Sequence, residues 1–205
     1  MKKLVLTAAI AFLGIVGLNA QSMESLQIGA RAGYNYSTLR GDKAKDLNLK
    51  GLSGYHVGMF VEVPVSERFS IQPEVQYSTQ GAKMEILKQE VKLKTQYINV
   101  PVLAKVYVAD GFNIQAGPQF GFKTGAKLET DKLKDDVKDL VSGFDFGLVF
   151  GAGYKTPVGL TIDARYDLGL TNVFDKDSKS PSTANISGGS DFKNGVFSVG
   201  LGYQF

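Results

Sequence analysis

Residues 160–170 read LTIDARYDLGL, and apolar and polar side chains alternate along the whole stretch. A period of two is the signature of a β-strand whose two faces meet different surroundings. The charged residues Asp163, Arg165 and Asp167 all fall on one face, while the other face carries only apolar and aromatic side chains. This stretch therefore predicts a strand with one apolar and one ionic face.

Seven further segments show the same alternation: residues 26–36, 55–63, 69–77, 98–108, 112–123, 144–154 and 197–205. No charged residue lies on the apolar face of any segment, although 21% of the chain is charged. The opposite faces mix Gly, Gln and Asn with ions. These ions are Arg31, Glu62, Glu74, Lys105, Lys123 and Asp145, in addition to Asp163, Arg165 and Asp167.

An unbroken apolar face paired with a mixed polar face distinguishes two classes of β-barrel. A soluble barrel has an apolar interior and a charged exterior, whereas a barrel in lipid is apolar outside and polar inside. Strands can cross a bilayer only as a closed sheet, because every backbone polar group must be paired internally. The sequence thus predicts an all-β, eight-stranded, antiparallel, up-and-down transmembrane β-barrel with a lumen filled by side chains.

The connections between these segments alternate in length. Residues 65–68, 109–111 and 156–159 form short, turn-rich links, whereas the others are long: residues 38–54, 78–96, 124–143 and 172–194. Membrane barrels of bacteria place short turns on the periplasmic side and long loops outside. We therefore expect both termini of the barrel to lie in the periplasm.

The composition excludes several other classes. The chain has one His and no Cys, so a disulfide scaffold and a cysteine metal site are excluded. A formal net charge of +3 gives no support for nucleic-acid binding. Residues 1–20 resemble a secretory signal peptide, with Lys2 and Lys3 before an apolar run and Ala20 at the expected cleavage site. We expect residues 21–205 to form the exported barrel domain in the outer membrane.

The inward face predicts a filled lumen. Eight strands enclose a space that side chains can just fill. The inward set holds four cations and five carboxylates, and buried ions persist only when they are paired. We expect a salt-bridge network that plugs the barrel, and a conducting path is the alternative. If the short turns set the register, long side chains face glycine. The expected pairs are Arg165 with Gly151, Glu74 with Gly58, and Leu103 with Gly117.

Other candidate sites have weaker signals. His56 falls on an inward position, and we expect it to pack in the lumen, because no nucleophile motif accompanies it and no metal-binding spacing appears. We expect no enzyme activity and no cofactor. Residues 131–141 carry apolar side chains at helical spacing and predict a short amphipathic helix. Four lysines in one outer loop could bind lipopolysaccharide phosphates, although a solvated loop is the alternative: Lys83, Lys88, Lys92 and Lys94.

Several motifs resemble one family over the whole predicted barrel. QPEVQYS at 72–78, YINVPVL at 97–103, GPQFG at 117–121 and DARYDLGL at 163–170 are similar to strands of the PorT-like outer-membrane β-barrel family of Bacteroidetes. The resemblance implies an architecture like that of OmpX and OmpA. The founding member is associated with secretion and gliding machinery, but most members have no defined activity.

The last strand also resembles the C-terminal signal that the barrel assembly machinery reads. Its alternate positions are Phe197, Val199, Leu201, Tyr203 and Phe205. We expect a structural or interaction protein that acts through its extracellular loops, with outer-membrane lipid and lipopolysaccharide around it. A narrow gated pore, or an accessory component of a secretion system, is the alternative. The third hypothesis for the function is an outer-membrane enzyme.

Overall fold

The chain folds into a closed antiparallel β-barrel. The computed structural model describes residues 26–41, 50–86, 89–129, 134–136, 142–173 and 192–205, so the predicted signal peptide lies outside the described residues. The strands are β1 (Gln27–Arg40), β2 (Lys50–Ser66), β3 (Phe69–Ile86), β4 (Gln89–Tyr107), β5 (Phe112–Glu129), β6 (Lys134–Asp136), β7 (Phe144–Lys155), β8 (Leu160–Gly169) and β9 (Lys193–Gln204).

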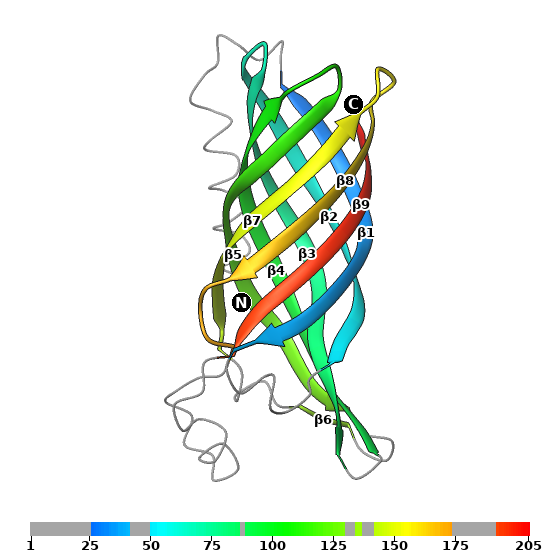
Figure 1. Ribbon diagram of the computed structural model, residues 1–205, viewed down its shortest axis with the longest axis vertical. Helices are drawn as coiled ribbons and strands as arrows, with labels where there is room; N and C mark the ends of the chain where they lie inside the picture. The colour runs from blue at the N-terminus through cyan, green and yellow to red at the C-terminus, as the bar shows by residue number, and fades with distance from the viewer. Residues whose placement is uncertain (1–25, 42–49, 87–88, 130–133, 137–141, 174–191) are drawn as a thin grey trace.

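Eight strands make the barrel, in the order β4-β3-β2-β1-β9-β8-β7-β5, and pairing of β4 with β5 closes it (Figure 1). All neighbouring strands are antiparallel. The short β6 pairs with the end of β5 outside this ring. Within the described ranges, no helix is long and apolar enough to cross a membrane.

The two ends of the barrel differ. Three tight connections (residues 67–68, 108–111 and 156–159) lie at one end with the chain's C-terminus, which we call the turn end (Figure 1). Gly111 and Gly159 have positive φ angles of 73° and 87° in these turns, a conformation that favours glycine. The opposite end is called the loop end.

At the loop end, β3, β4 and β5 continue beyond the other strands with β6 beside them (Figure 1). Residues 78–96 were predicted as a long loop, but they belong to a β-hairpin that stays paired as far as Ile86 and Gln89. The alternation fades there because no apolar face is required beyond the belt. The helix predicted at 131–141 is also wrong where it is described, because Lys134–Asp136 is a strand.

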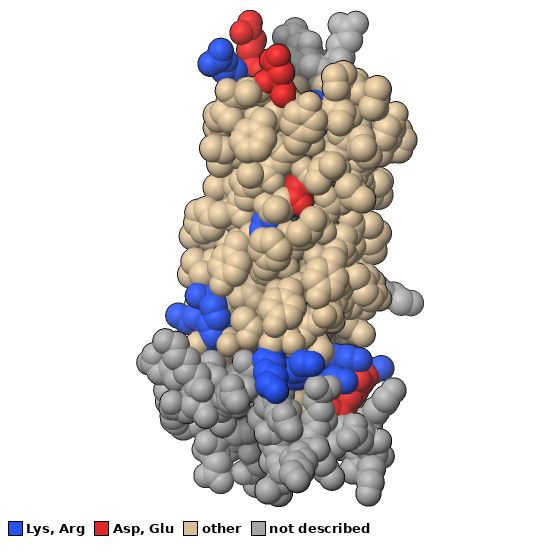
Figure 2. Space-filling view, turned by 45° about the vertical axis from the view of Figure 1, so that its right-hand side comes forward, with Lys and Arg blue, Asp and Glu red and all other residues tan. Residues whose placement is uncertain are grey.

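The apolar faces of the strands point outward, as predicted. Val57, Met59 and Ile114 are each more than half exposed, although all three lie within long strands. Figure 2 shows a broad band of uncharged side chains, interrupted in this view by one small blue and one small red area. Lys, Arg, Asp and Glu gather above and below the band. Such a belt is suited to the acyl chains of a bilayer, and the eight-stranded transmembrane barrel is confirmed.

The strand register decides which side chains meet across the lumen. Arg165 lies opposite Gly151, as predicted. The pairing of Glu74 with Gly58 is wrong, because Phe60 lies opposite Glu74. The predicted four-residue link is a turn of two residues, 67–68, with irregular pairing just before it, so the register moves by two. A shift of two keeps every side chain on its predicted face.

Candidate functional site

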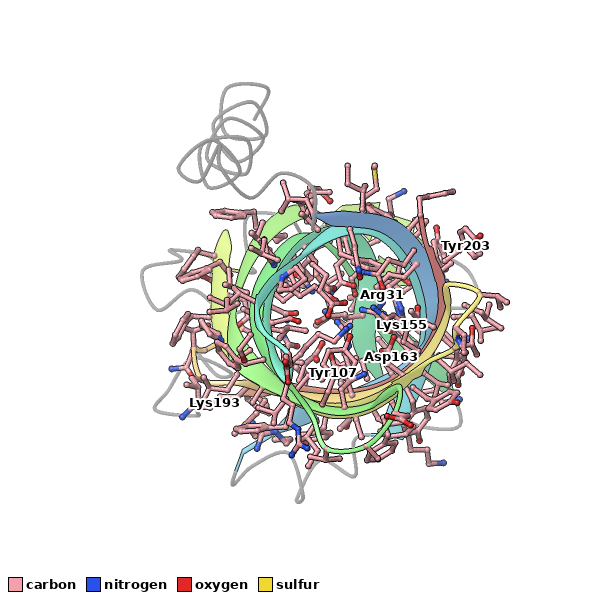
Figure 3. The ribbon with its side chains drawn as sticks, turned by 90° about the horizontal axis from the view of Figure 1, so that it is seen from above. Arg31, Tyr107, Lys155, Asp163, Lys193 and Tyr203 are labelled. Atoms are coloured by element: carbon pink, nitrogen blue, oxygen red, sulfur yellow. The ribbon has the colours of Figure 1, made fainter. Side chains whose placement is uncertain are left out.

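Four ions form a cluster in the middle of the lumen, which we call the central ion cluster. Glu74 Oε2 accepts hydrogen bonds from Arg165 Nη1 at 2.9 Å and Arg31 Nη1 at 3.3 Å. Asp163 Oδ1 lies 2.6 Å from Arg31 Nη2 and 2.9 Å from Arg165 Nε. Figure 3 shows Arg31 and Asp163 inside the ring of strands. Two cations and two carboxylates balance, so the cluster carries no net charge.

A second group lies between this cluster and the turn end, and we call it the turn-side cluster. Glu62 accepts hydrogen bonds from Lys105 Nζ at 2.9 Å, Tyr107 OH at 2.6 Å and Gln204 Nε2 at 3.1 Å. Lys105 also donates to Gln72 Oε1 at 2.9 Å. Both oxygens of this buried carboxylate therefore have partners.

Gln72 joins the two clusters. Its amide nitrogen donates to Glu74 Oε1 at 2.6 Å, while its amide oxygen accepts from Lys105. A neutral amide can bridge a carboxylate and an ammonium because it carries both a donor and an acceptor. Six of the nine ions predicted for the lumen are thus connected: Arg31, Glu62, Glu74, Lys105, Asp163 and Arg165.

The other three predicted ions lie nearer the loop end, and Asp167 is close enough to Arg165 and Arg31 to interact with both electrostatically. Asp145 accepts hydrogen bonds from Thr171 Oγ1 at 2.5 Å and Asn194 Nδ2 at 2.7 Å, so its described partners are neutral. Asp167 borders a small cavity near the loop end. Lys123 is half-buried where the pairing of β4 with β5 shifts by one residue.

His56 is buried in the lumen on the loop-end side. Its Nδ1 lies 2.8 Å from Asn35 Oδ1, and Asn35 Nδ2 donates to Ser78 Oγ at 3.0 Å. The histidine therefore belongs to a chain of neutral polar groups. Among the described residues, no group of three His, Cys, Asp or Glu side chains could hold a metal ion.

An apolar cluster at the loop end was missed from the sequence. Its buried members come from β1, β3, β5 and the segments flanking the last long connection, and Leu93 of β4 packs against them. The buried members are Leu39, Ala82, Ala126, Val173 and Phe192. The inward position of Leu93, beyond the alternating segment, was the one signal in the sequence. We call this group the loop-end apolar cluster.

Basic residues surround the loop end of the barrel. Lys83 and Lys92 lie opposite each other in the hairpin of β3 and β4, while Lys88 lies outside the described residues. Lys94 is 46% exposed and forms an ion pair with Glu129 at 2.6 Å. Sequence reasoning missed four further basic residues at this end: Arg40, Lys50, Lys127 and Lys193. Figure 2 shows Lys and Arg side chains gathered below the apolar band.

The five C-terminal positions predicted as an assembly signal line the outside of β9. Phe197, Val199, Leu201 and Tyr203 are exposed on the apolar belt, and Phe205 is 80% exposed at the turn end. The rings of Tyr203 and Phe205 meet edge to face with centroids 5.1 Å apart. Tyr203 points away from the lumen in Figure 3.

A closed barrel with an apolar belt and an ionic interior defines an integral outer-membrane β-barrel protein. Residues 19–175 match the family described as outer membrane protein beta-barrel domain, and the chain belongs to this family. The family and the fold indicate a location in the bacterial outer membrane. No curated protein matches the sequence.

Solved structures of outer-membrane barrels are similar to the chain. Neisserial surface protein A is 10% identical with a TM-score of 0.58, over 87% of this chain and 97% of that one. The outer membrane protein OprG of Pseudomonas aeruginosa is 13% identical with a TM-score of 0.44, over 87% of this chain and 95% of that one. At these identities the likeness concerns the fold alone.

Proposed function

We propose that this barrel is a structural or interaction protein, that it works through its loop-end surface, and that its lumen is occluded. The observation that carries the proposal is the pair of neutral ion clusters that span the lumen. Buried ions that are paired with one another fill space, whereas a conduction path needs groups that can exchange water for solute. The missing catalytic motif in the sequence supports a role other than catalysis.

The packing around the central ion cluster and toward the loop end supports occlusion. The cavity beside the central ion cluster has a volume of about 20 Å³, and the cavity beside Asp167 has about 10 Å³. Each holds about one water molecule. The loop-end apolar cluster lies beyond them and would have to move before a hydrated solute could pass.

The loop end offers the working surface. The hairpin of β3 and β4 is paired as far as Ile86 and Gln89 and is flanked by β5 and β6. It therefore extends the sheet beyond the apolar belt. We propose the PorT-like family of Bacteroidetes as the finer classification, on the motifs quoted above. We also propose a cleaved signal peptide at residues 1–20 and a periplasmic turn end. The C-terminal positions of β9 would then be read by the barrel assembly machinery.

Planar-bilayer recording tests the occluded lumen. We expect the refolded barrel to carry no ionic current, even at a salt concentration of about 1 M KCl, because the ion clusters block the passage. Steps on the order of hundreds of picosiemens would contradict the proposal and favour the narrow gated pore. A refolded porin with an open lumen, inserted under the same conditions, is the positive control.

The basic loop end is proposed to bind lipopolysaccharide phosphates. Lys94 and Lys127 are cross-strand neighbours and both are exposed. Replacing both with Gln should weaken lipopolysaccharide binding to the nanodisc-embedded barrel on the order of 30-fold, because each lysine near an anionic surface contributes about 1 kcal/mol. Binding would be followed by microscale thermophoresis. Arg68→Gln, in the exposed turn between β2 and β3 at the turn end, is the control, and equal losses in both proteins would contradict the assignment.

A further inference from the structure

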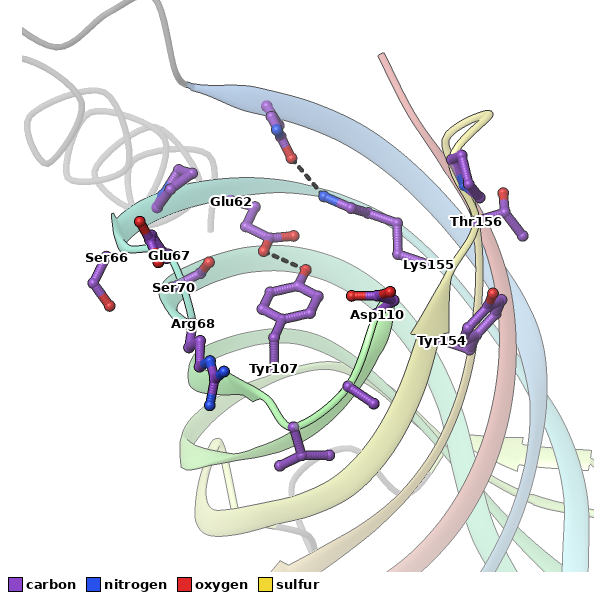
Figure 4. A pocket seen from close by; sticks show the side chains of 16 residues that line it. Glu62, Ser66, Glu67, Arg68, Ser70, Tyr107, Asp110, Tyr154, Lys155 and Thr156 are labelled. Atoms are coloured by element: carbon purple, nitrogen blue, oxygen red, sulfur yellow. Dashed lines mark hydrogen bonds between the residues drawn. The ribbon is translucent and has the colours of Figure 1, made fainter.

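A cavity opens at the turn end of the barrel, away from the loop-end surface. Its volume is about 530 Å³, which lies within the range of small-molecule sites. Residues of β1, β2, β4 and β7 and the three tight turns line it. Figure 4 shows Glu62, Tyr107 and Lys155 directed into this space from three different strands.

Lys155 is the cation that reaches into this cavity beside Tyr107, and its described partners there carry no charge. Its ammonium donates to the neutral amide oxygen of Gln27 at 2.9 Å and lies 5.6 Å from the centre of the Tyr107 ring. Among the described residues, no carboxylate lies within ion-pair distance of it. An ammonium held by one amide and one ring face retains donors for an anion.

The deep end of the cavity favours a negatively charged ligand over a positively charged one. Glu62 is only 1% exposed, and both its oxygens accept hydrogen bonds from the turn-side cluster. A cationic ligand therefore finds no free carboxylate there. Beside Lys155, a dianion would lie close to the negative charge of Glu62. The turns that line the cavity add one cation, Arg68, and two carboxylates, Glu67 and Asp110. Next to Lys155, a single negative charge is therefore favoured over two.

The walls favour an organic body attached to that anion. The Tyr107 ring supplies a flat face, and apolar side chains of β2 and of the turns line the cavity: Pro64, Val108, Ala109 and Pro157. We propose that the turn-end cavity binds a small organic monocarboxylate. Its carboxylate pairs with Lys155 Nζ, and its flat apolar body lies against the ring of Tyr107.

Benzoate is the probe that tests this site, with the barrel embedded in nanodiscs. We expect saturable shifts in the NMR signals of the Lys155 ε-methylene and the Tyr107 ring, with a Kd on the order of 1 mM. Benzamide, which has the same shape without the charge, should bind at least about tenfold more weakly. Phenyl phosphate, a dianion, should also bind more weakly than benzoate. Equal binding of benzamide, or tighter binding of phenyl phosphate, would overturn the proposal.

Two variants separate the site from nonspecific binding. Lys155→Met should weaken benzoate binding at least about tenfold, while Lys193→Met, on the outside of the barrel at the loop end (Figure 3), should leave it unchanged. Unchanged binding to Lys155→Met would overturn the assignment. Should that variant not refold, cross-relaxation between benzoate protons and the Tyr107 ring of the unaltered barrel decides, and its absence at saturation equally overturns the site.

Discussion

Glu74→Gln should lower the free energy of unfolding by about 3–5 kcal/mol, because it removes the carboxylate that accepts hydrogen bonds from two buried arginines. Glu74 is 0% exposed and accepts hydrogen bonds from both guanidinium groups of the central ion cluster. The amide keeps the shape of the side chain, so the loss reports on charge. Urea unfolding of the barrel in lipid vesicles measures it.

The matched control is Glu67→Gln in the exposed turn between β2 and β3, which should change stability by less than about 0.5 kcal/mol. Combining Glu74→Gln with Arg165→Gln restores the balance of one cation and one anion, and should cost less than the sum of the two single changes. Equal effects of Glu74→Gln and Glu67→Gln would show that the lumen ions are solvated and do not depend on pairing.

Val57→Arg should cost about 2–4 kcal/mol of stability in a lipid bilayer, because it places a charge on the lipid face near the midplane. Val57 is 51% exposed, lies in the middle of β2, and neighbours Ala32 and Tyr77 on the adjacent strands. The arginine there can reach water only by distorting the belt or the bilayer.

Val158→Arg is the control for this experiment, since Val158 is 73% exposed in the turn between β7 and β8. It should cost no more than about 1 kcal/mol, the value expected near the interface. Equilibrium unfolding in vesicles compares the two variants. If both lose the same stability, the apolar belt does not meet lipid.

Alternation with a period of two predicted the barrel because it records which face meets lipid. The lumen ions were placed on the correct face for the same reason, since face depends only on whether a position is odd or even. The partner of Glu74 was missed because the register depends on the length of a turn. The two-residue turn at 67–68 moved Phe60, in place of Gly58, opposite this carboxylate.

The loop end was predicted less well, because the rule of alternation applies only where lipid is present. Beyond the belt, the hairpin of β3 and β4 is stabilised by its backbone pairing, which carries little signal in the side chains. The loop-end apolar cluster joins residues from both halves of the chain, such as Leu39 and Phe192. Such a contact arises from closure of the ring and has no local sequence pattern.

The hydrogen bond from Arg31 to Asp163 has a consequence for how the barrel is completed. These residues are 132 positions apart, and the bond spans β9, where the first and last strands of the ring meet. A second link joins Gln27 of β1 to Gln204 of β9 at 2.8 Å on the same seam. An unzipped seam would leave Arg31 without this carboxylate, at a high desolvation cost. Pairing of β1 with β9 and neutralisation of the lumen ions are therefore a single cooperative event. An open sheet in which β1 and β9 are not yet paired is unfavourable in the membrane.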